Sequence, residues 1–271
     1  MLFIKQFYLK YILFAFASYV LLGCVAAPVK IDMAATPAHD EKDSSTFEQR
    51  LGEAGYYFMM LNFKFVDDAK TVNRLSRIGA RISHYTERPN IKYKYFILDS
   101  KYRNAFAIPD GYVFLTSSLI TTLKDDDKIA AVIAHEIAHI THKHQLENYE
   151  RKKGSNPLRA IIGRDVFNSA TEIGYSMAHE FQADQTSLRY LYRSGFDPKA
   201  VISSLDDLKH IEAEDAAEYE KDRKNQPQKE SDSKFLAVHP YTKNRIVNAI
   251  NYLDEVYKTE KNQYNPQDFN F

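Results

Sequence analysis

The sequence has one cysteine in 271 residues, so no disulfide can form within the chain. It also lacks an excess of either charge, because 36 lysine and arginine residues balance 36 aspartate and glutamate residues. This balance gives no indication of a nucleic-acid partner, and we find no internal repeat. The hydrophobic content of 44% is typical of a globular protein, and the chain is long enough for one domain with a substantial core.

The apolar run near the N-terminus is too short to span a bilayer. It occupies residues 11–23, after Lys5 and Lys10, and matches the apolar core of an export signal, whereas a membrane span needs ~20 residues. It ends in Leu-Leu-Gly-Cys, which resembles the bacterial lipobox, whose cysteine thiol receives a diacylglycerol. We therefore predict a lipoprotein signal peptide over residues 1–23 and a lipid anchor on Cys24. The alternative is an uncleaved membrane anchor that contains a cysteine by chance.

Both interpretations put the rest of the chain outside the inner membrane. Val25 follows the cysteine, whereas an aspartate there often retains a lipoprotein in the inner membrane. We therefore predict attachment to the periplasmic side of the outer membrane. The small, polar and proline-bearing residues 24–45 predict a flexible tether. A folded domain over residues 46–260 and a C-terminal tail over 261–271 complete the predicted organisation.

The remaining pattern predicts an α+β fold that is mostly helical, with a small β-sheet. We expect helical spacing over 46–88, a strand over 91–98, two short strands around a Pro-Asp-Gly turn over 104–116, and helices that begin near Asp125, Thr171 and Pro198 and after His239. We also expect a short amphipathic piece over 158–170. The charged residues 212–234 predict a solvated loop or frayed helix.

His135, Glu136 and His139 form an H-E-x-x-H motif on the helix that begins near Asp125. Residues four apart lie on one face of a helix, so both imidazoles can reach a zinc ion at ~2.0–2.1 Å. The glutamate between them points at the open coordination position, where it can act as a general base. The alternative is a helix with solvent-facing histidines, but alanine and isoleucine occupy most of this segment.

A third metal ligand is expected on the next strong helix. Glu180 in the segment "AHEFQAD" is the candidate, and Asp184 lies one turn further on the same face. A carboxylate at Asp184 can accept a hydrogen bond from the free ring nitrogen of a zinc-bound histidine. His179 is a rival third ligand, although it faces about 100° away from Glu180 on a helix with 3.6 residues per turn.

Four ordered motifs of this chain resemble the gluzincin metallopeptidases, the family that includes the CAAX prenyl protease and the bacterial lipoproteins BepA and LoiP. The resemblance covers about residues 50–255. Its motifs are Asn104-Ala105-Phe106 with Pro109 and Gly111, the segment "HEIAHITHKH" that ends at His144, the segment "EFQAD", and the segment "HPYTKNRI" with His239, Pro240 and Arg245.

The resemblance implies a zincin-type domain with one zinc ion per chain. His135, His139 and Glu180 would bind the zinc, and Glu136 would be the general base. His239 would donate to the oxyanion of the tetrahedral intermediate or fill the open zinc position in a latent state, and a plain helix-start histidine is the alternative.

The remaining motif residues would support the site or bind the substrate. Asp184 and His144 would support the zinc ligands, and Arg245 would contact the substrate or an active-site carboxylate. The stretch Asn104, Ala105 and Phe106 would form the sheet edge that pairs with an extended peptide, although the residues alone fit an internal strand equally well. We expect His142 to face solvent.

The sequence therefore predicts a zinc-dependent endopeptidase of the bacterial cell envelope. By the resemblance, it would act in quality control of misfolded or unassembled outer-membrane and periplasmic proteins, with polypeptides as its partners. Residues 151–170 would gate the cleft, and the charged segment 212–234 would form a second lid. The alternatives are a periplasmic chaperone or assembly factor with a latent zinc site, and a metallohydrolase that acts on the cell wall.

Overall fold

The computed structural model describes residues 41–153, 175–225, 239 and 243–269. Their elements in chain order are α2 (Glu41–Asn62), α3 (Ala69–Ser83), β1 (Lys94–Leu98), β2 (Ala105–Ile108), β3 (Tyr112–Thr116), α4 (Ser117–Leu123), α5 (Asp126–Thr141), α6 (His144–Lys153), α8 (Met177–Ser194), α9 (Lys199–Asn225), α10 (Lys243–Thr259) and the 3-10 turn η2 (Pro266–Asp268). The predicted mostly helical α+β fold with a small sheet is confirmed.

The sheet has the strand order β1-β3-β2 in the described part of the chain. β1 runs parallel to β3, and β2 pairs antiparallel with β3 through a tight turn. Asp110 and Gly111 form this turn with φ angles of 63° and 83°, which a glycine adopts without steric cost. The predicted pair of strands around a Pro-Asp-Gly turn is therefore present, and β2 lies at the edge of the sheet.

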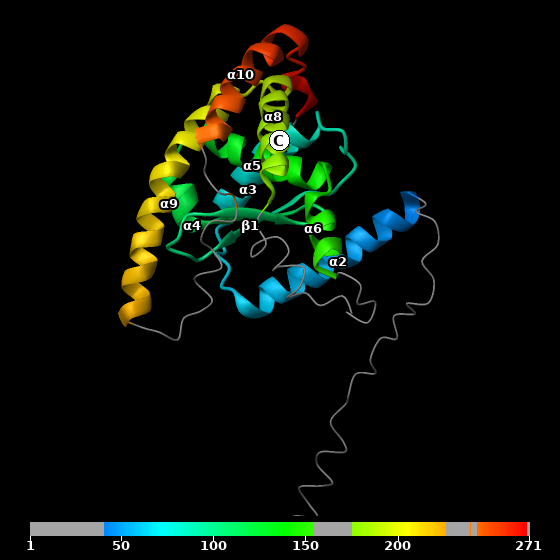
Figure 1. The fold of residues 1–271 in the computed structure, drawn as a ribbon. Helices are drawn as coiled ribbons and strands as arrows, with labels where there is room; N and C mark the ends of the chain where they lie inside the picture. The colour runs from blue at the N-terminus through cyan, green and yellow to red at the C-terminus, as the bar shows by residue number, and fades with distance from the viewer. Residues whose placement is uncertain (1–40, 154–174, 226–238, 240–242, 270–271) are drawn as a thin grey trace, which may run out of the picture. The chain divides into compact units, whose positions relative to one another are not determined.

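Helices cover both faces of the sheet (Figure 1). Alternate strand residues point to opposite faces. On one face Phe96, Phe106 and Phe114 stack into an aromatic cluster under α2. On the other face, smaller apolar side chains such as Val113 and Leu115 belong to the larger hydrophobic core, which they form with the apolar residues of α3, α5 and α8. The sheet therefore lies between α2 on one face and the main helical layer on the other.

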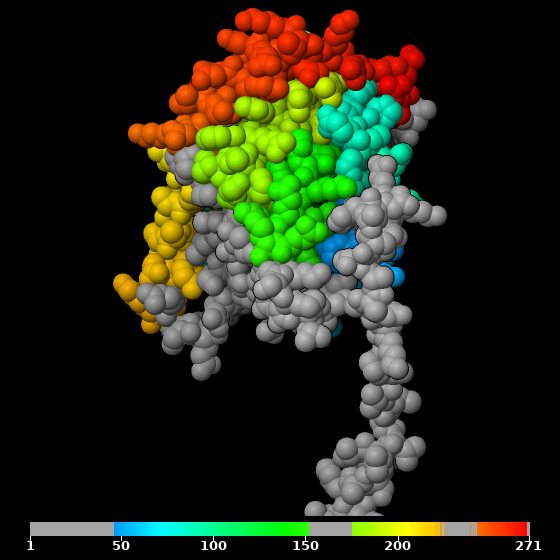
Figure 2. Space-filling model, turned by 45° about the vertical axis from the view of Figure 1, so that its right-hand side comes forward, coloured from blue at the N-terminus to red at the C-terminus, as the bar shows by residue number. Residues whose placement is uncertain are grey.

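The helical layer is centred on α5, whose apolar residues are almost all buried. Helices α3, α8 and α9 pack around α5, and α10 packs on α8 and α9. Figure 2 shows α8 reaching the surface beside α10. No helix in the described part of the chain is long and apolar enough to cross a membrane.

Three helix boundaries differ from the expectations. The helical pattern over 46–88 is broken between α2 and α3, where Asp68 caps α3 by accepting hydrogen bonds from the backbone amides of Lys70 and Thr71. α2 itself begins at Glu41, within the span predicted as a tether. The helix expected from Thr171 begins at Met177, because Ser176 is its N-cap. Its predicted end is confirmed by Gly195, which has a φ of 73°.

The charged segment that was expected to be solvated is helical as far as Asn225. Its acidic residues do not simply face water, because Asp215 binds Arg103 and Glu218 binds Lys101. These pairs hold α9 against the loop that precedes β2, which a composition argument cannot foresee. The amphipathic piece over 158–170, nearly all of the predicted gating segment 151–170, and residues 226–234 of the second predicted lid lie outside the described residues.

Candidate metal centre

Helix α5 places the H-E-x-x-H residues in the middle of the domain. Asp125 caps this helix and Asp126 and Asp127 lie in its first turn, where carboxylates are favourable beside the helix dipole. Alanine and isoleucine fill the faces that touch the sheet and the other helices. His135, Glu136 and His139 are buried, so neither imidazole is a solvent-facing surface residue.

Helix α8 places Glu180 opposite α5. The hydroxyl of Ser176 accepts a hydrogen bond from the backbone amide of His179 and so fixes the start of the helix. Glu180 then lies in the first helical turn and is 0% exposed. Asp184 follows one turn later and is also buried.

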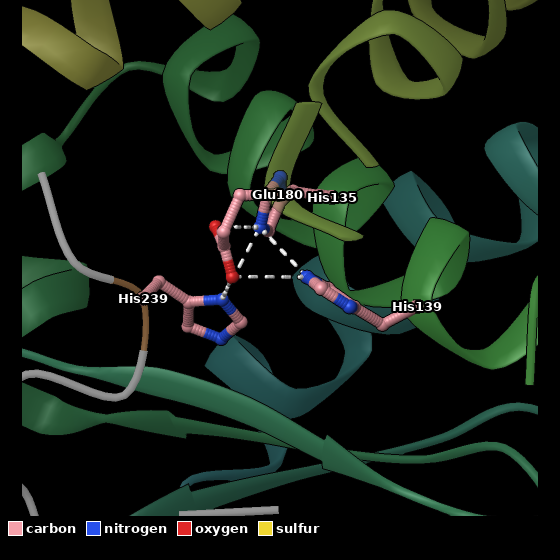
Figure 3. A group of neighbouring side chains, drawn as sticks. All are labelled: His135, His139, Glu180 and His239. Carbon is pink, nitrogen blue, oxygen red and sulfur yellow. Dashed lines mark hydrogen bonds and ion pairs between the residues drawn. The ribbon is translucent and has the colours of Figure 1, made fainter. Parts of the chain in front are cut away.

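Four side chains converge on one point (Figure 3). The ligand atoms of His135, His139, Glu180 and His239 all lie within 4.8 Å of one another. The Nε2 atoms of His135 and His139 are 3.0 Å apart, and Glu180 oxygens lie 3.4 Å and 3.7 Å from these two nitrogens. Nδ1 of His239 is 3.3 Å from Nε2 of His135 and 3.0 Å from Oε1 of Glu180.

These separations fit a tetrahedral ion. Ligands ~2.1 Å from a tetrahedral centre are about 3.4 Å from each other, and three imidazoles with one carboxylate form a donor set that zinc accepts. The close approach of the Nε2 atoms of His135 and His139 also indicates a site for a cation. His135 directs Nδ1 at Asp184, so Nε2 is the ring atom that faces His139 and is available to a cation. A cation between the rings would use the lone pairs of both Nε2 atoms.

The buried carboxylates make the centre favourable for a positive charge. Burial lowers the pKa of His239, but Glu136 and Glu180 outweigh burial and raise it to about 10. Burial also raises the pKa of Glu180, but the positive charges of His239 and Arg245 hold that pKa well below its usual range. Glu180 is therefore an anion at neutral pH, as a metal ligand must be.

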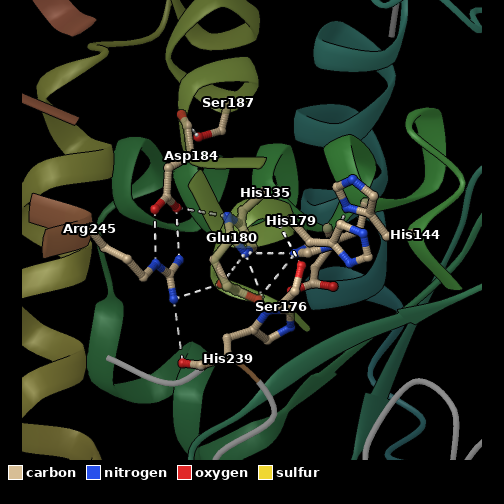
Figure 4. A network of polar contacts seen from close by, with 11 residues as sticks. His135, His144, Ser176, His179, Glu180, Asp184, Ser187, His239 and Arg245 are labelled. Atoms are coloured by element: carbon tan, nitrogen blue, oxygen red, sulfur yellow. Dashed lines mark hydrogen bonds and ion pairs between the residues drawn. The ribbon is translucent and has the colours of Figure 1, made fainter. Parts of the chain in front are cut away.

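Asp184 and Arg245 form a buried support behind the cluster (Figure 4). Nε and Nη2 of Arg245 donate to the two oxygens of Asp184 at 2.8 and 2.7 Å. Nη1 of Arg245 lies 2.8 Å from Oε2 of Glu180. Oδ1 of Asp184 lies 3.0 Å from Nδ1 of His135, so it accepts the proton that fixes the tautomer of this ring. One guanidinium thus connects two acidic side chains of α8.

His144 lies closer to the centre than its spacing suggests. Lys143 has a left-handed backbone with a φ of 59°, which ends the α5 segment and lets α6 begin at His144. The chain reversal brings Nδ1 of His144 to 2.8 Å from Nδ1 of His139. A continuous helix would have turned this side chain to another face, so the contact could not be read from the sequence.

His142 and His179 both lie near this chain reversal, outside the group of candidate ligands. His142 was expected to face solvent, and this is wrong: its ring is partly buried and Nε2 lies 2.8 Å from Oγ1 of Thr186. His179, the rival third ligand, lies outside the cluster. It stacks on His144 at 4.1 Å between ring centroids and pairs with Glu147.

Glu136 and Tyr175 complete the surroundings of the cluster. Oε1 of Glu136 lies 3.2 Å from Nε2 of His239, and its other oxygen is buried without a hydrogen-bond partner. The ring of Tyr175 stacks on His139 at a centroid distance of 3.7 Å. Nothing in the motif spacing pointed to Tyr175, because it reaches the site from the residues just before α8.

The predicted substrate strand begins beside this cluster. Asn104 accepts a hydrogen bond from the backbone amide of Ala105 through its side chain, and its own backbone pairs with Thr116 of β3. Ala105 and Phe106 are the first two residues of β2. In the described part of the chain, β2 has β3 as a neighbour on one side only. Cys24, the predicted lipidation site, lies outside the described residues.

Comparison with known proteins is consistent with this geometry. Residues 69–173 and 158–253 match the sequence profile of peptidase family M48. The beta-barrel assembly-enhancing protease of Escherichia coli is 25% identical over 231 residues, which cover 77% of this chain and 44% of that protein. The mitochondrial metalloendopeptidase OMA1 of Schizosaccharomyces pombe is 24% identical over 78% of this chain and 63% of its own length. The chain thus spans about half the length of such relatives.

Proposed function

The chain belongs to peptidase family M48, and from this premise we propose that it is a zinc-dependent endopeptidase of the bacterial cell envelope. The observation that carries the proposal is the tetrahedral cluster of His135, His139, Glu180 and His239 with Glu136 directly beside it. A structural zinc site is closed by four permanent protein ligands, whereas a catalytic site must free one position for water or substrate and, in the H-E-x-x-H peptidases, has a glutamate beside it as the base.

In this proposal His135, His139 and Glu180 hold the zinc ion. When bound, zinc supplies Lewis acidity, which polarises a peptide carbonyl and lowers the pKa of a water molecule toward 7. Glu136 accepts the proton of the attacking water on its carboxylate and then delivers it to the leaving amine nitrogen. Its buried oxygen without a hydrogen-bond partner supports this role, because a free acceptor is what a base requires.

Asp184, Arg245 and His144 position the ligands. Asp184 holds the ring of His135, and His144 holds the ring of His139. Arg245 binds both Asp184 and Glu180, so it sets the distance between the ligand carboxylate and the supporting carboxylate. This bidentate geometry favours an active-site carboxylate as the partner of Arg245, rather than the substrate.

His239 would provide the fourth ligand of a bound metal in a resting state. Its Nδ1 lies as close to the ligand atoms of His135 and Glu180 as these lie to each other. A substrate would then have to displace His239, and the ring would be available to donate to the developing oxyanion. We expect His239→Ala to keep one zinc per chain and to change the rate of casein cleavage, whereas His210→Ala, at an exposed position on α9, leaves it unchanged.

The substrate is an extended polypeptide that pairs with β2. Asn104, Ala105 and Phe106 lie at the start of β2, which is an edge strand within the described part of the chain, and an extended peptide could add to a strand in this position. This mode of binding requires an unfolded or unpaired segment, because a folded protein has few free strand edges. Misfolded or unassembled envelope proteins supply such segments, which agrees with the name of the Escherichia coli relative, a beta-barrel assembly-enhancing protease.

The envelope location rests on the N-terminal sequence. The export signal over 1–23 and the lipobox cysteine at Cys24 support a lipid anchor on the periplasmic side, at the outer membrane. The test is Cys24→Ala with fractionation of the cell. We expect the wild type in the membrane fraction and the variant released from it, and the same fraction for both proteins would contradict the anchor.

A chaperone or assembly factor with a latent zinc site is the second candidate. The position of His239 within the cluster favours it, because a permanently filled fourth position would leave no place for a substrate. The endopeptidase requires Glu136 as a general base, whereas the chaperone does not.

The experiment compares the wild type with Glu136→Gln, and Glu150→Gln at an exposed position of α6 is the control. Bound zinc and cleavage of unfolded casein are measured on the same samples. Equal zinc in all three proteins, with cleavage lost in Glu136→Gln alone, supports the endopeptidase. Zinc in all three with no cleavage by any of them favours the chaperone, and no zinc in any contradicts the ligand set.

A further inference from the structure

The last turns of α2 carry apolar side chains that the core of the protein does not use. Residues 56–63 read YYFMMLNF. Within them Tyr57, Met60 and Leu61 are 65%, 50% and 85% exposed. Positions three and four apart share one face of a helix, so these three side chains form one surface, the α2 patch. Single exposed apolar residues are common, whereas a contiguous group marks a surface that binds a partner.

The opposite face of α2 is fixed against the sheet. Tyr56 stacks on Tyr112 at 5.2 Å between ring centroids, and its ring lies 5.0 Å from that of Phe96. Leu51 and Met59 are completely buried in the same cluster. The α2 patch therefore cannot turn inward without the loss of this packing. A helix that is apolar on both faces is expected where both faces are covered.

The rest of the exposed face of α2 is polar. Gln49, Arg50 and Glu53 are exposed on it, so the apolar character is confined to the end of the helix. Just beyond this end, Nζ of Lys64 lies 2.5 Å from Oδ2 of Asp99 at the surface. The borders of the α2 patch thus carry charges of both signs, and its partner is recognised by apolar surface rather than by charge.

A phospholipid leaflet is the partner that fits the α2 patch. Tyrosine has an apolar ring and a polar hydroxyl, which suit the boundary between headgroups and acyl chains, and methionine and leucine insert below it. A second copy of the chain fits less well. A stable dimer buries ~800 Å² on each partner, whereas three side chains of about 200 Å² each provide less.

The proposed lipid anchor brings a leaflet within reach of the α2 patch. Residues 25–40 lie between Cys24 and Glu41, the first residue of α2. A segment of this length spans at most about 60 Å, and the patch lies about 30 Å along α2 from Glu41. The segment is therefore long enough for α2 to lie flat on the leaflet. Such a tether gives a roughly millimolar effective concentration, so a modest apolar contact suffices for docking.

We propose that the α2 patch inserts into the phospholipid leaflet that holds the Cys24 anchor and so orients the domain. The inference rests on the lipid anchor of the proposed function. α2 and the helical layer with the metal centre lie on opposite faces of the sheet (Figure 1). Two layers of about 10 Å each then separate the metal centre from the leaflet. The enzyme therefore acts on polypeptide segments that extend about six residues or more from the membrane.

The first test measures the depth of a dye on the full lipoprotein, reconstituted in vesicles of phosphatidylethanolamine and phosphatidylglycerol. Leu61→Cys carries a nitrobenzoxadiazole dye. Val247→Cys is the control on α10, where the native apolar side chain is 55% exposed. Lipidation blocks the thiol of Cys24, so only the introduced thiol reacts. We expect lipids with a doxyl group near the headgroup to quench the dye at position 61 and to leave the dye at position 247 unchanged.

The second test measures lipid binding without the anchor. The mature chain, which begins at Cys24 in the proposed function, is made without lipid and floated with vesicles in excess. Loss of one inserted apolar side chain should lower the partition coefficient by about tenfold, so Leu61→Ser floats less than the wild type and Tyr57→Ser/Leu61→Ser least. Val247→Ser should match the wild type. High salt should change none of these values, because charge does not drive the contact.

The outcomes separate this inference from the proposed function. An unquenched dye at position 61, equal quenching at both positions, or flotation that the Tyr57 and Leu61 variants leave unchanged overturns the docking. Crosslinks between two Leu61→Cys chains in place of quenching assign the α2 patch to a second copy and also overturn it. A mass spectrum without lipid on the mature chain contradicts the anchor instead, and flotation then still decides whether the patch binds a leaflet.

Discussion

Nδ1 of His139 lies 2.8 Å from Nδ1 of His144 in the buried wall behind the metal centre. Two ring nitrogens at this distance share one proton, so one ring donates and the other accepts. Burial holds the pKa of His139 well below its usual range and lowers the pKa of His144 to about 4. Both rings are therefore neutral at neutral pH, and each has one donor and one acceptor nitrogen.

With Nε2 of His139 facing the metal ligands, its Nδ1 carries the proton and His144 accepts it. Nε2 of His144 must then donate to Oε1 of Gln182 at 3.0 Å. The amide nitrogen of Gln182 donates to Nδ1 of His142 at 3.2 Å, and Nε2 of His142 donates to Oγ1 of Thr186 at 2.8 Å. Every hydrogen bond in this series from His139 to Thr186 is donated in the direction away from the metal centre. The position of the proton on Nδ1 of His139 therefore fixes the donor and acceptor of each later bond.

The donor-to-acceptor direction of these hydrogen bonds predicts different effects on zinc affinity for two substitutions of Gln182. Gln182→Glu keeps an acceptor for Nε2 of His144, whereas Gln182→Lys offers donors only and forces His144 to turn its proton toward His139. We expect Gln182→Lys to weaken zinc binding by about 10- to 100-fold, the cost of losing such a partner, and Gln182→Glu to stay within a few-fold. Competition with a chromophoric chelator measures both, and equal affinities would contradict the assigned direction.

Arg245 should matter more for the metal-free protein than a surface charge does. It is 1% exposed and compensates Asp184 and Glu180. Removal of one partner of a buried charged network costs about 3–5 kcal/mol. We expect Arg245→Met to lower the free energy of unfolding in urea by this amount, while Arg77→Met at an exposed position of α3 changes it by about 0.5 kcal/mol or less. A loss below about 1 kcal/mol for Arg245→Met would show that the network is not needed for folding.

The turn between β2 and β3 predicts that a substitution of Gly111 lowers the stability of the protein. A Cβ atom on Gly111 would lie 2.7 Å from a methyl carbon of Ile91, and the φ of Gly111 is 83°. We expect Gly111→Ala to destabilise the protein by about 1–3 kcal/mol. Asp110, in the same turn, has a left-handed backbone with a φ of 63°, which glycine adopts without steric cost. Asp110→Gly should therefore leave the stability nearly unchanged. Thermal unfolding compares the two, and a harmless Gly111→Ala would mean that the turn relaxes readily.

Local motifs made most of the centre predictable. The spacing of His135 and His139 fixes their shared face on any helix, and Glu180 and Asp184 share a face of α8 for the same reason. The hairpin was predictable because the Pro-Asp-Gly turn gives a local signal. These inferences need only the geometry of one element, and the structure brings these residues together.

What could not be predicted depends on contacts between distant segments. Tyr175 stacks on His139 of α5, and Gln182 binds His144 at the start of α6. The extension of α9 to Asn225 was predicted only as one of two alternatives, a frayed helix or a solvated loop, because the pairing of its acidic residues with Lys101 and Arg103 is not visible in the sequence. The sequence shows such charges but not the partners that the fold supplies.

The most direct test of the account is zinc K-edge X-ray absorption on the wild type and His239→Ala, each loaded with zinc. The account predicts one zinc per chain with four nitrogen or oxygen ligands at ~2.0–2.1 Å and no sulfur. It also predicts that His239→Ala keeps the metal and reduces the histidine ligands from three to two. A six-coordinate oxygen shell, or a zinc content far below one per chain after loading, would contradict the assignment of His135, His139 and Glu180 as the metal centre.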